Sequence, residues 1–276
     1  MEESVKEAFF VSFPKNGRTW IRIILSKIIY ETFNLSEKEI PEYYLLNIKR
    51  LCEEAGRIPI TMTHDDSANH LVYKKLEEDK SNYIDKKVIL LIRDPRDTLV
   101  SYYFHRTKRW KPIDDKGISA FIRDKRYGIR KILRFYNIWN QWINKIDEVL
   151  VVRYEDMHMN PKTTIKRMLA FLEIQDEVSE EIIDHAIEFA NFNNLKHLEK
   201  ENYFHTNKMR PADLNDDETF KVRRGVVNGF DDYLLPDDIE FLNDLIIRTK
   251  CPLINYYKEI IKYEKPQGLR WINTTQ

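Results

Sequence analysis

The segment Phe13-Pro14-Lys15-Asn16-Gly17-Arg18-Thr19-Trp20 joins a short apolar run, residues 8–12, to a stretch of helical periodicity, residues 20–30. A strand that stops at Pro14 and turns through Gly17 into a helix leaves several backbone N–H groups directed outward, at the positive end of the helix dipole. Lys15 and Thr19 flank these groups. The segment therefore predicts an anion-binding turn, which we call the anion loop (residues 13–20).

The anion loop departs from the Walker A pattern GxxxxGK[ST], in which two glycines come before the lysine. Here Lys15 comes before Gly17, which is the loop's one glycine. Taken alone, the segment is also compatible with an ordinary strand-to-helix turn whose lysine is solvated. Other motifs have to decide between these two interpretations.

Length and composition predict one α/β domain, because the 276 residues are 42% hydrophobic and 12% aromatic. We expect no signal peptide and no transmembrane segment, since the longest apolar runs have the length of strands. Cys52 and Cys251 are interpreted as reduced structural thiols, and the protein is expected in the cytoplasm. Lys plus Arg equals Asp plus Glu, at 45 each, which argues against a nucleic-acid partner.

Charge is nevertheless uneven along the chain. Residues 93–134 contain 13 basic residues against five aspartates, a net charge of +8. Such a basic sector is typical either of a protein that steers an anionic ligand or of a solvated helix face.

Apolar runs rich in β-branched residues alternate with helical patterns, which predicts a central parallel sheet flanked by helices. Strands are expected at residues 8–13, 58–63, 87–93 and 149–154, and helices at residues 20–31, 94–109, 129–144, 162–172, 180–191 and 237–249. Helix caps are expected at Asp94, Asn160 and Ser179. Ligands collect at the carboxyl ends of such strands, where this chain has Lys15, His64, Arg93 and Tyr154.

A second informative segment, residues 91–105, reads LIRDPRDTLVSYYFH. With the anion loop, it resembles the sulfotransferase family that uses 3′-phosphoadenosine 5′-phosphosulfate (PAPS). In that family a P-K-x-G-x-T-W loop grips the 5′-phosphosulfate, and an R-[DN]-P-x-D-x-x-x-S-Y-Y segment holds the 3′-phosphate. The resemblance implies that Arg93 and Ser101 hold this phosphate here.

Three further matches follow in the family's order. The pair Thr63-His64 resembles the T-H pair whose histidine is the catalytic base. Tyr154-Glu155-Asp156-Met157 with Asn160-Pro161 resembles Y-E-D-M-x-x-N-P, whose tyrosine faces the adenine, and Arg223-Arg224-Gly225 resembles the late R-[KR]-G motif. The resemblance covers roughly residues 8–250 and implies a single domain of P-loop NTPase-like sulfotransferase fold over residues 1–276, with residues 251–276 as a C-terminal extension.

The resemblance also implies the roles of the site residues. PAPS would be the donor and 3′-phosphoadenosine 5′-phosphate (PAP) the product, without a metal. Lys15 would neutralise the departing oxygen and His64 would be the base, with His105 as the fallback. The expected donor-binding residues are Lys15, Asn16, Gly17, Arg18, Thr19, Trp20, Arg93, Ser101, Tyr154, Phe192, Arg223, Arg224 and Gly225.

Some residues depart from the family pattern. Asn16 stands where serine is usual, which preserves a polar contact, and Arg18 stands where a small hydroxyl or Asn is common. Met62 replaces the lysine that many cytosolic members place before T-H, a charge that Arg18 is able to restore. Two alternatives stay open: a P-loop nucleotide kinase, and a nucleotide-binding protein without turnover.

The sequence does not identify the acceptor beyond a hydroxyl or amine, and it leaves a homodimer open. Two segments expected to be irregular, residues 105–127 and 199–230, have the length of functional loops. The acceptor wall is expected from residues 105–136 and 200–205, which supply the aromatic residues Trp110, Tyr127, Tyr136, Tyr203 and Phe204.

Overall fold

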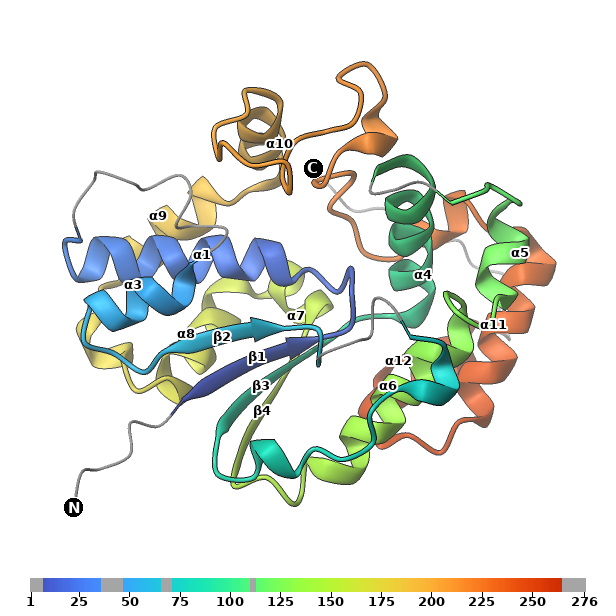
Figure 1. The fold of residues 1–276 in the computed structure, drawn as a ribbon, viewed down its shortest axis with the longest axis horizontal. Coiled ribbons are helices and arrows are strands. Elements are labelled where there is room, and N and C mark those ends of the chain that lie inside the picture. The colour runs from blue at the N-terminus through green and yellow to red at the C-terminus, as the bar shows by residue number, and fades with distance from the viewer. Residues whose placement is uncertain (1–6, 36–46, 66–70, 110–112, 265–276) are drawn as a thin grey trace.

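The computed structural model describes residues 7–35, 47–65, 71–109 and 113–264. At its centre is a four-stranded parallel sheet of order β2-β1-β3-β4 (Figure 1). The strands are β1 (Ala8–Ser12), β2 (Ile60–Thr63), β3 (Lys87–Ile92) and β4 (Glu148–Arg153). The predicted α/β architecture is confirmed, and each predicted strand is correct to within two residues at either end.

Side chains of β3 alternate between two hydrophobic cores, one on each face of the sheet. Ile89 and Leu91 belong to one core, and Val88, Leu90 and Ile92 to the other. All six residues of β3 are buried, as expected for a central strand of a parallel sheet that is covered on both faces.

The helices divide between the two faces in the same way (Figure 1). On one face lie α1 (Arg18–Thr32), α3 (Ile48–Glu54), α8 (Pro161–Phe171) and α9 (Glu180–Phe189). On the other lie α4 (Pro95–Phe104), α5 (Ile118–Arg123), α6 (Ile129–Trp142), α11 (Pro236–Arg248) and α12 (Asn255–Glu264). Two further helices, α7 (Tyr154–Met159) and α10 (Phe192–Lys200), follow β4 and α9.

The predicted helix over residues 94–109 has two parts. It begins as α4, whose cap Asp94 accepts a hydrogen bond from the backbone N–H of Arg96 at 2.8 Å, and it continues as a π-helix, His105–Arg109. The expectation that residues 105–127 are irregular is therefore wrong, because this π-helix and α5 occupy much of the segment. Residues 201–230 do lack α-helices and strands.

The other caps give a mixed result. Ser179 accepts a hydrogen bond from the N–H of Ile182, as expected, whereas the Asn160 side chain makes no capping bond and α8 starts on Pro161 alone. Residues 251–264, which belong to the predicted C-terminal extension, pack into the core through Tyr257 and Ile261. Cys52 and Cys251 are buried free thiols. Within the described ranges, no helix combines the length and apolar character needed to cross a membrane.

Candidate active site

The anion loop lies at the carboxyl edge of the sheet, between the end of β1 and the start of α1. Its backbone is left-handed at Lys15 (φ 74°) and Gly17 (φ 97°), and a Cβ atom on Gly17 would lie 2.4 Å from the ring of Tyr154. The N–H groups of Gly17, Arg18 and Thr19 have no acceptor among the described residues. They are therefore free to bind an anion at the positive end of α1.

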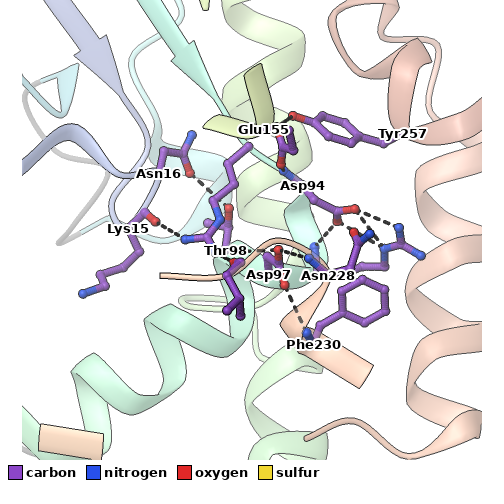
Figure 2. A network of polar contacts seen from close by, with 12 residues as sticks. Lys15, Asn16, Asp94, Asp97, Thr98, Glu155, Asn228, Phe230 and Tyr257 are labelled. Atoms are coloured by element: carbon purple, nitrogen blue, oxygen red, sulfur yellow. Dashed lines mark hydrogen bonds and ion pairs between the residues drawn. The ribbon is translucent and has the colours of Figure 1, made fainter. Parts of the chain in front are cut away.

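The backbone of Lys15 belongs to the polar network drawn in Figure 2, whereas its ammonium group extends away from that network. Its carbonyl oxygen accepts a hydrogen bond from Arg93 Nη1 at 3.2 Å. Burial lowers the pKa of Lys15 well below its ordinary value, and the charges of Lys221, Arg109 and Arg223 lower it further. A bound anion would relieve this repulsion.

The polar contact to a ligand expected from the Asn16 side chain is not what the structure shows. This side chain is fully buried and points into the protein. Its Nδ2 donates to the carbonyl oxygen of Leu91 at 3.0 Å and to Tyr136 Oη at 2.9 Å, while its Oδ1 accepts from Thr98 Oγ1 at 3.1 Å. Asn16 therefore fixes the anion loop to β3, α4 and α6.

His64 follows β2 directly, and its side chain lies against the end of β1. Its Nδ1 lies 2.9 Å from the carbonyl oxygen of Ser12, an acceptor, so Nδ1 carries the proton and Nε2 is left as a proton acceptor. Burial lowers the pKa of His64 well below 6.5, and Arg18, Lys221 and Arg22 lower it further. The ring is thus neutral at pH 7.

The cations around His64 and Lys15 come from three parts of the chain. Arg18 and Arg22 lie one turn apart on α1, Arg109 ends the π-helix, and Lys221 belongs to the late irregular segment. Burial and mutual repulsion lower the pKa of Arg18 to about 9 and that of Lys221 to about 8. Within this group Glu199 is an anion, and it already pairs with Arg109 Nη1 at 3.0 Å.

Sequence analysis missed Lys221, Arg109 and Glu199 as parts of this site. Glu199 accepts hydrogen bonds from the backbone N–H groups of Lys221 and Val222 in addition to its ion pair with Arg109. A hint was present in the sequence, because Lys221 lies two residues before the Arg223-Arg224-Gly225 motif. The contact between residues 199 and 221 is not readable from spacing.

The second expected anion site joins the end of β3 to the late motif. Arg93 Nη2 donates to the carbonyl oxygen of Val226 at 3.2 Å and lies 3.6 Å from Asp97 Oδ2. Asp97 in turn accepts from the N–H groups of Asn228 and Phe230 at 2.9 and 3.0 Å (Figure 2). Residues 93–97 and 226–230 are therefore in direct contact, just after the predicted motif Arg223-Arg224-Gly225.

The arginines of the late motif have partners of their own. Arg223 Nη1 pairs with Glu218 at 2.9 Å, and Arg224 Nη1 pairs with Asp232 at 2.6 Å. By contrast, Arg93 Nε is buried without a hydrogen-bond partner, and the Ser101 hydroxyl has none among the described residues. Arg93 and Ser101 are the groups of this site left open to a phosphate.

Aromatic rings pack against one another near Arg93 and the anion loop. The rings of Trp20 and Tyr154 pack edge to face, with centroids 5.8 Å apart, and the guanidinium of Arg93 lies 4.0 Å from the centre of Tyr154. A Cβ on Gly225 would lie 2.5 Å from the ring of Phe192, so these two residues are also in contact. His158 was not predicted, yet its ring lies 4.8 Å from that of Trp20 and its Nε2 is buried and unpartnered.

The prediction of the acceptor wall is wrong for two of its residues. Tyr136 is fully buried and accepts a hydrogen bond from the N–H of Arg93, and Phe204 is buried in the core. Tyr127 and Tyr203 are partly exposed, and Trp110 lies outside the described residues.

The basic sector is only partly internal: Arg96 and Lys131 are buried, whereas half of its described basic residues are exposed. Several of its arginines form ion pairs: Arg96 with Asp94, Arg109 with Glu199, Arg123 with Asp238, and Arg134 with Glu78.

The fold and the strand–loop–helix anion site place this chain among the P-loop-like α/β proteins. Within that class, residues 6–251 match the sulfotransferase domain family, and the chain belongs to this family. The family predicted from the motifs is thereby confirmed.

Named relatives agree with this assignment. Cytosolic sulfotransferase 15 of Arabidopsis thaliana is 28% identical over 194 residues, which are 65% of this chain and 50% of that protein. Amine sulfotransferase of Oryctolagus cuniculus is 28% identical over 213 residues, 71% of this chain and 65% of that protein. The chain thus aligns with about half to two thirds of the length of these relatives.

Solved structures share the fold. Mouse sulfotransferase SULT7A1, solved in complex with PAP, has a TM-score of 0.62 and 21% identity, over 94% of this chain and 90% of that one. Retinol dehydratase, solved with retinol and PAP, has a TM-score of 0.58 and 17% identity, over 99% and 85% of the two chains.

Proposed function

We propose that this chain transfers a sulfuryl group from PAPS to a hydroxyl or amine of an acceptor and releases PAP. One observation carries the proposal: Lys15, His64, Arg93 and Tyr154 follow four different strands and lie at one edge of the sheet, around the unpaired N–H groups of the anion loop. The presence of PAP in the mouse relative's structure supports the same donor.

The residues present fit this donor. The anion-loop N–H groups and Lys15 suit a 5′-phosphosulfate, and the open Nε of Arg93 with the Ser101 hydroxyl suits a 3′-phosphate. The rings of Trp20 and Tyr154 suit a purine. Arg223 and Arg224 would exchange Glu218 and Asp232 for the phosphate when the donor binds.

His64 and Lys15 have complementary tasks in this reaction. The acceptor oxygen or nitrogen forms a bond to sulfur while the bond from sulfur to the bridging oxygen of the donor breaks. His64 Nε2 takes the acceptor's proton, and the carbonyl of Ser12 stabilises the resulting imidazolium through Nδ1–H. Lys15 and the loop N–H groups stabilise the negative charge that develops on the departing oxygen.

The two alternatives are less well supported. A P-loop kinase would be expected to carry GxxxxGK[ST] before α1, and the anion loop has a different pattern. A binding protein without turnover would have no need of a neutral histidine with an open Nε2 beside the anion loop.

The proposal is tested by incubating the purified chain with ³⁵S-labelled PAPS and a broad panel of phenols, alcohols and amines. We expect labelled product, and we expect Lys15→Ala to lower single-turnover transfer by about a hundredfold or more. Tight PAP binding without transfer to any acceptor would favour the binding protein, and phosphoryl transfer from ATP would favour the kinase.

A further inference from the structure

We propose that Asp65 is a positioning residue for the proposed base, His64. The buried carboxylate of Asp65 is held by three side chains, and it fixes the chain just after β2 so that the imidazole stays against the carbonyl of Ser12. This inference rests on the proposed function, in which His64 takes the acceptor's proton, and it names the group that keeps His64 oriented for that step.

His64 lies just beyond the last paired residue of β2. That residue is Thr63, which pairs with Val11 of β1, so the register of the sheet ends one residue before His64. On the other side of His64, the backbone of Asp65 is left-handed (φ 55°), and its N–H donates to Thr63 Oγ1 at 2.9 Å. The orientation of His64 therefore depends on how firmly Asp65 is held.

The Asp65 carboxylate contacts three side chains. Its Oδ2 lies 2.8 Å from Lys80 Nζ and accepts a hydrogen bond from Trp139 Nε1 at 3.1 Å. Its Oδ1 accepts from Tyr83 Oη at 3.3 Å. The side chains of Asp65 and Lys80 are 8% and 1% exposed, so the ion pair is shielded from water. Because both carboxylate oxygens have partners, the side chain has little freedom to reorient.

The groups that hold this carboxylate are themselves anchored. The ring of Tyr83 packs against Trp139 of α6 and against Phe9 of β1, with centroids 5.2 and 5.1 Å apart. The same strand, β1, carries Ser12, whose carbonyl oxygen accepts from His64. Both ends of the contact that orients the imidazole are therefore tied to one packed cluster.

A buried ion pair in this position favours a role in orientation over one in stability. Removing two charges from water costs about as much as their attraction returns, so apolar side chains of similar volume would serve stability equally well. An ion pair with additional hydrogen bonds instead favours one arrangement of the chain. That restriction matters beside His64, because misplacing a reacting group by about 1 Å lowers the rate by as much as about a hundredfold.

The test measures kcat and donor-site binding separately. Asp65→Ala should lower kcat by roughly ten- to a hundredfold, while calorimetric binding of PAP stays within about twofold. Asp65→Asn keeps an oxygen that accepts from Trp139, so it should recover part of the loss. Asp85→Asn, which changes an exposed aspartate, is the matched control and should leave kcat unchanged. A kcat for Asp65→Ala within about twofold of the wild type would overturn the inference.

The loss also has to act through His64. In a His64→Ala background, Asp65→Ala should have almost no further effect on kcat, as expected for two residues that act as a unit. An equal loss in both backgrounds would show that Asp65 has a merely structural role, and it would contradict the inference.

A double variant separates lost positioning from a defect in folding. Asp65→Ala alone leaves the Lys80 ammonium buried without its carboxylate partner, which destabilises a fold. Asp65→Ala combined with Lys80→Met removes both charges, and it replaces the single variant if that one does not fold. Its kcat should be as low as that of Asp65→Ala. A kcat restored to the wild-type value would show that the unpaired lysine caused the loss, and the inference would be wrong.

A spectroscopic readout does not require activity. In ¹⁵N NMR spectra of the imidazole groups, His64 should show a ring protonated at Nδ1, and the His64→Ala spectrum assigns its signal. Asp65→Ala should change this signal and leave those of the other histidines in place. An unchanged His64 signal would overturn the inference, whereas a wild type that transfers no sulfuryl group would instead count against the proposed function.

Discussion

At the scale of single residues, two histidines share Lys221 as a neighbouring cation but are held differently. His64 donates its Nδ1–H to Ser12, which leaves Nε2 open, whereas His105 Nδ1 is buried without a partner. Burial and then Lys15 lower the pKa of His105, so it too lies close to the reacting centre. Hydrogen bonding, more than proximity, distinguishes the proposed base His64 from His105.

We therefore expect His64→Ala to lower kcat by roughly 10²- to 10⁴-fold, because the open Nε2 of His64 is the proposed acceptor of the proton. His105→Ala, the matched control, should cost less than tenfold. PAP binding, measured by calorimetry, should change little in either variant. If His105→Ala proves the more damaging of the two, the assignment of the base is wrong.

The pH dependence follows from the cations around His64. Its pKa is lowered below 6.5, so the neutral, active form persists to lower pH than for a free histidine. The acid limb of kcat/KM should lie below pH 6.5. Removing a neighbouring cation should raise the pKa of His64, so Arg18→Met should move this limb to higher pH.

The position of the limb tests this effect even if Arg18→Met also lowers the maximal rate. Arg248→Met, a surface variant on α11, should leave the limb where it is. An unmoved limb in Arg18→Met would mean that another group controls the pH profile.

At the scale of elements, buried polar groups fix how the helices meet the sheet. Asp97 on α4 binds the backbone of residues 228 and 230, which carries the late arginine motif to the end of β3. Glu155 on α7 accepts from the N–H of Asp94 at 2.9 Å and from Tyr257 Oη at 2.7 Å, which joins α7 to the start of α4 and to α12 (Figure 2).

Glu155 makes stability depend on pH. Burial raises its pKa from 4.5 to about 7, so between these values the folded chain holds a proton that the unfolded chain has lost. Stability from this group therefore falls as pH rises from about 4.5 to about 7. Relative to Glu155→Gln, which cannot titrate, the wild type should lose on the order of 2–3 kcal/mol of unfolding free energy over this range.

Urea unfolding of both proteins at pH 5 and pH 8 measures this difference. Glu201→Gln, which changes an exposed glutamate, should follow the wild type. Parallel pH dependence of the wild type and Glu155→Gln would show that the Glu155 carboxyl keeps an ordinary pKa.

At the scale of the whole molecule, the sequence predicted the sheet and its ligand-binding edge because both depend on local patterns. Buried strands read as apolar runs, and the anion loop, Arg93 and Tyr154 follow them directly. The short helices α3, α7 and α10 escaped prediction because tertiary packing, not length or periodicity, stabilises them.

Long-range contacts account for the errors at the site. Asn16 was expected at the donor and Tyr136 as an aromatic contact to the acceptor, but their side chains bond to each other inside the core. The backbone of Lys221 is bound by Glu199, which lies on a different element. Sequence spacing carries no information about pairs such as these.

The proposed 3′-phosphate site makes a prediction about donor selectivity, because we infer that Arg93, Ser101 and the late arginines, from distant parts of the chain, bind one phosphate. PAP has a 3′-phosphate that AMP lacks, and each charge-assisted contact to it contributes about 1.5–3 kcal/mol. The wild type should therefore bind PAP at least roughly 10²-fold more tightly than AMP in calorimetry.

Arg224→Ala should weaken PAP binding by about tenfold or more and leave AMP binding nearly unchanged, since Arg224 would contact only the 3′-phosphate. Arg224 is the better choice than Arg93, because Arg93 also holds the Lys15 carbonyl and its loss would disturb the anion loop. Arg248→Ala controls for the loss of a surface charge. Equal affinities of the wild type for PAP and AMP would mean that residues 93–101 and 223–225 form no second phosphate site, and the proposed donor would have to be replaced by a nucleotide without a 3′-phosphate.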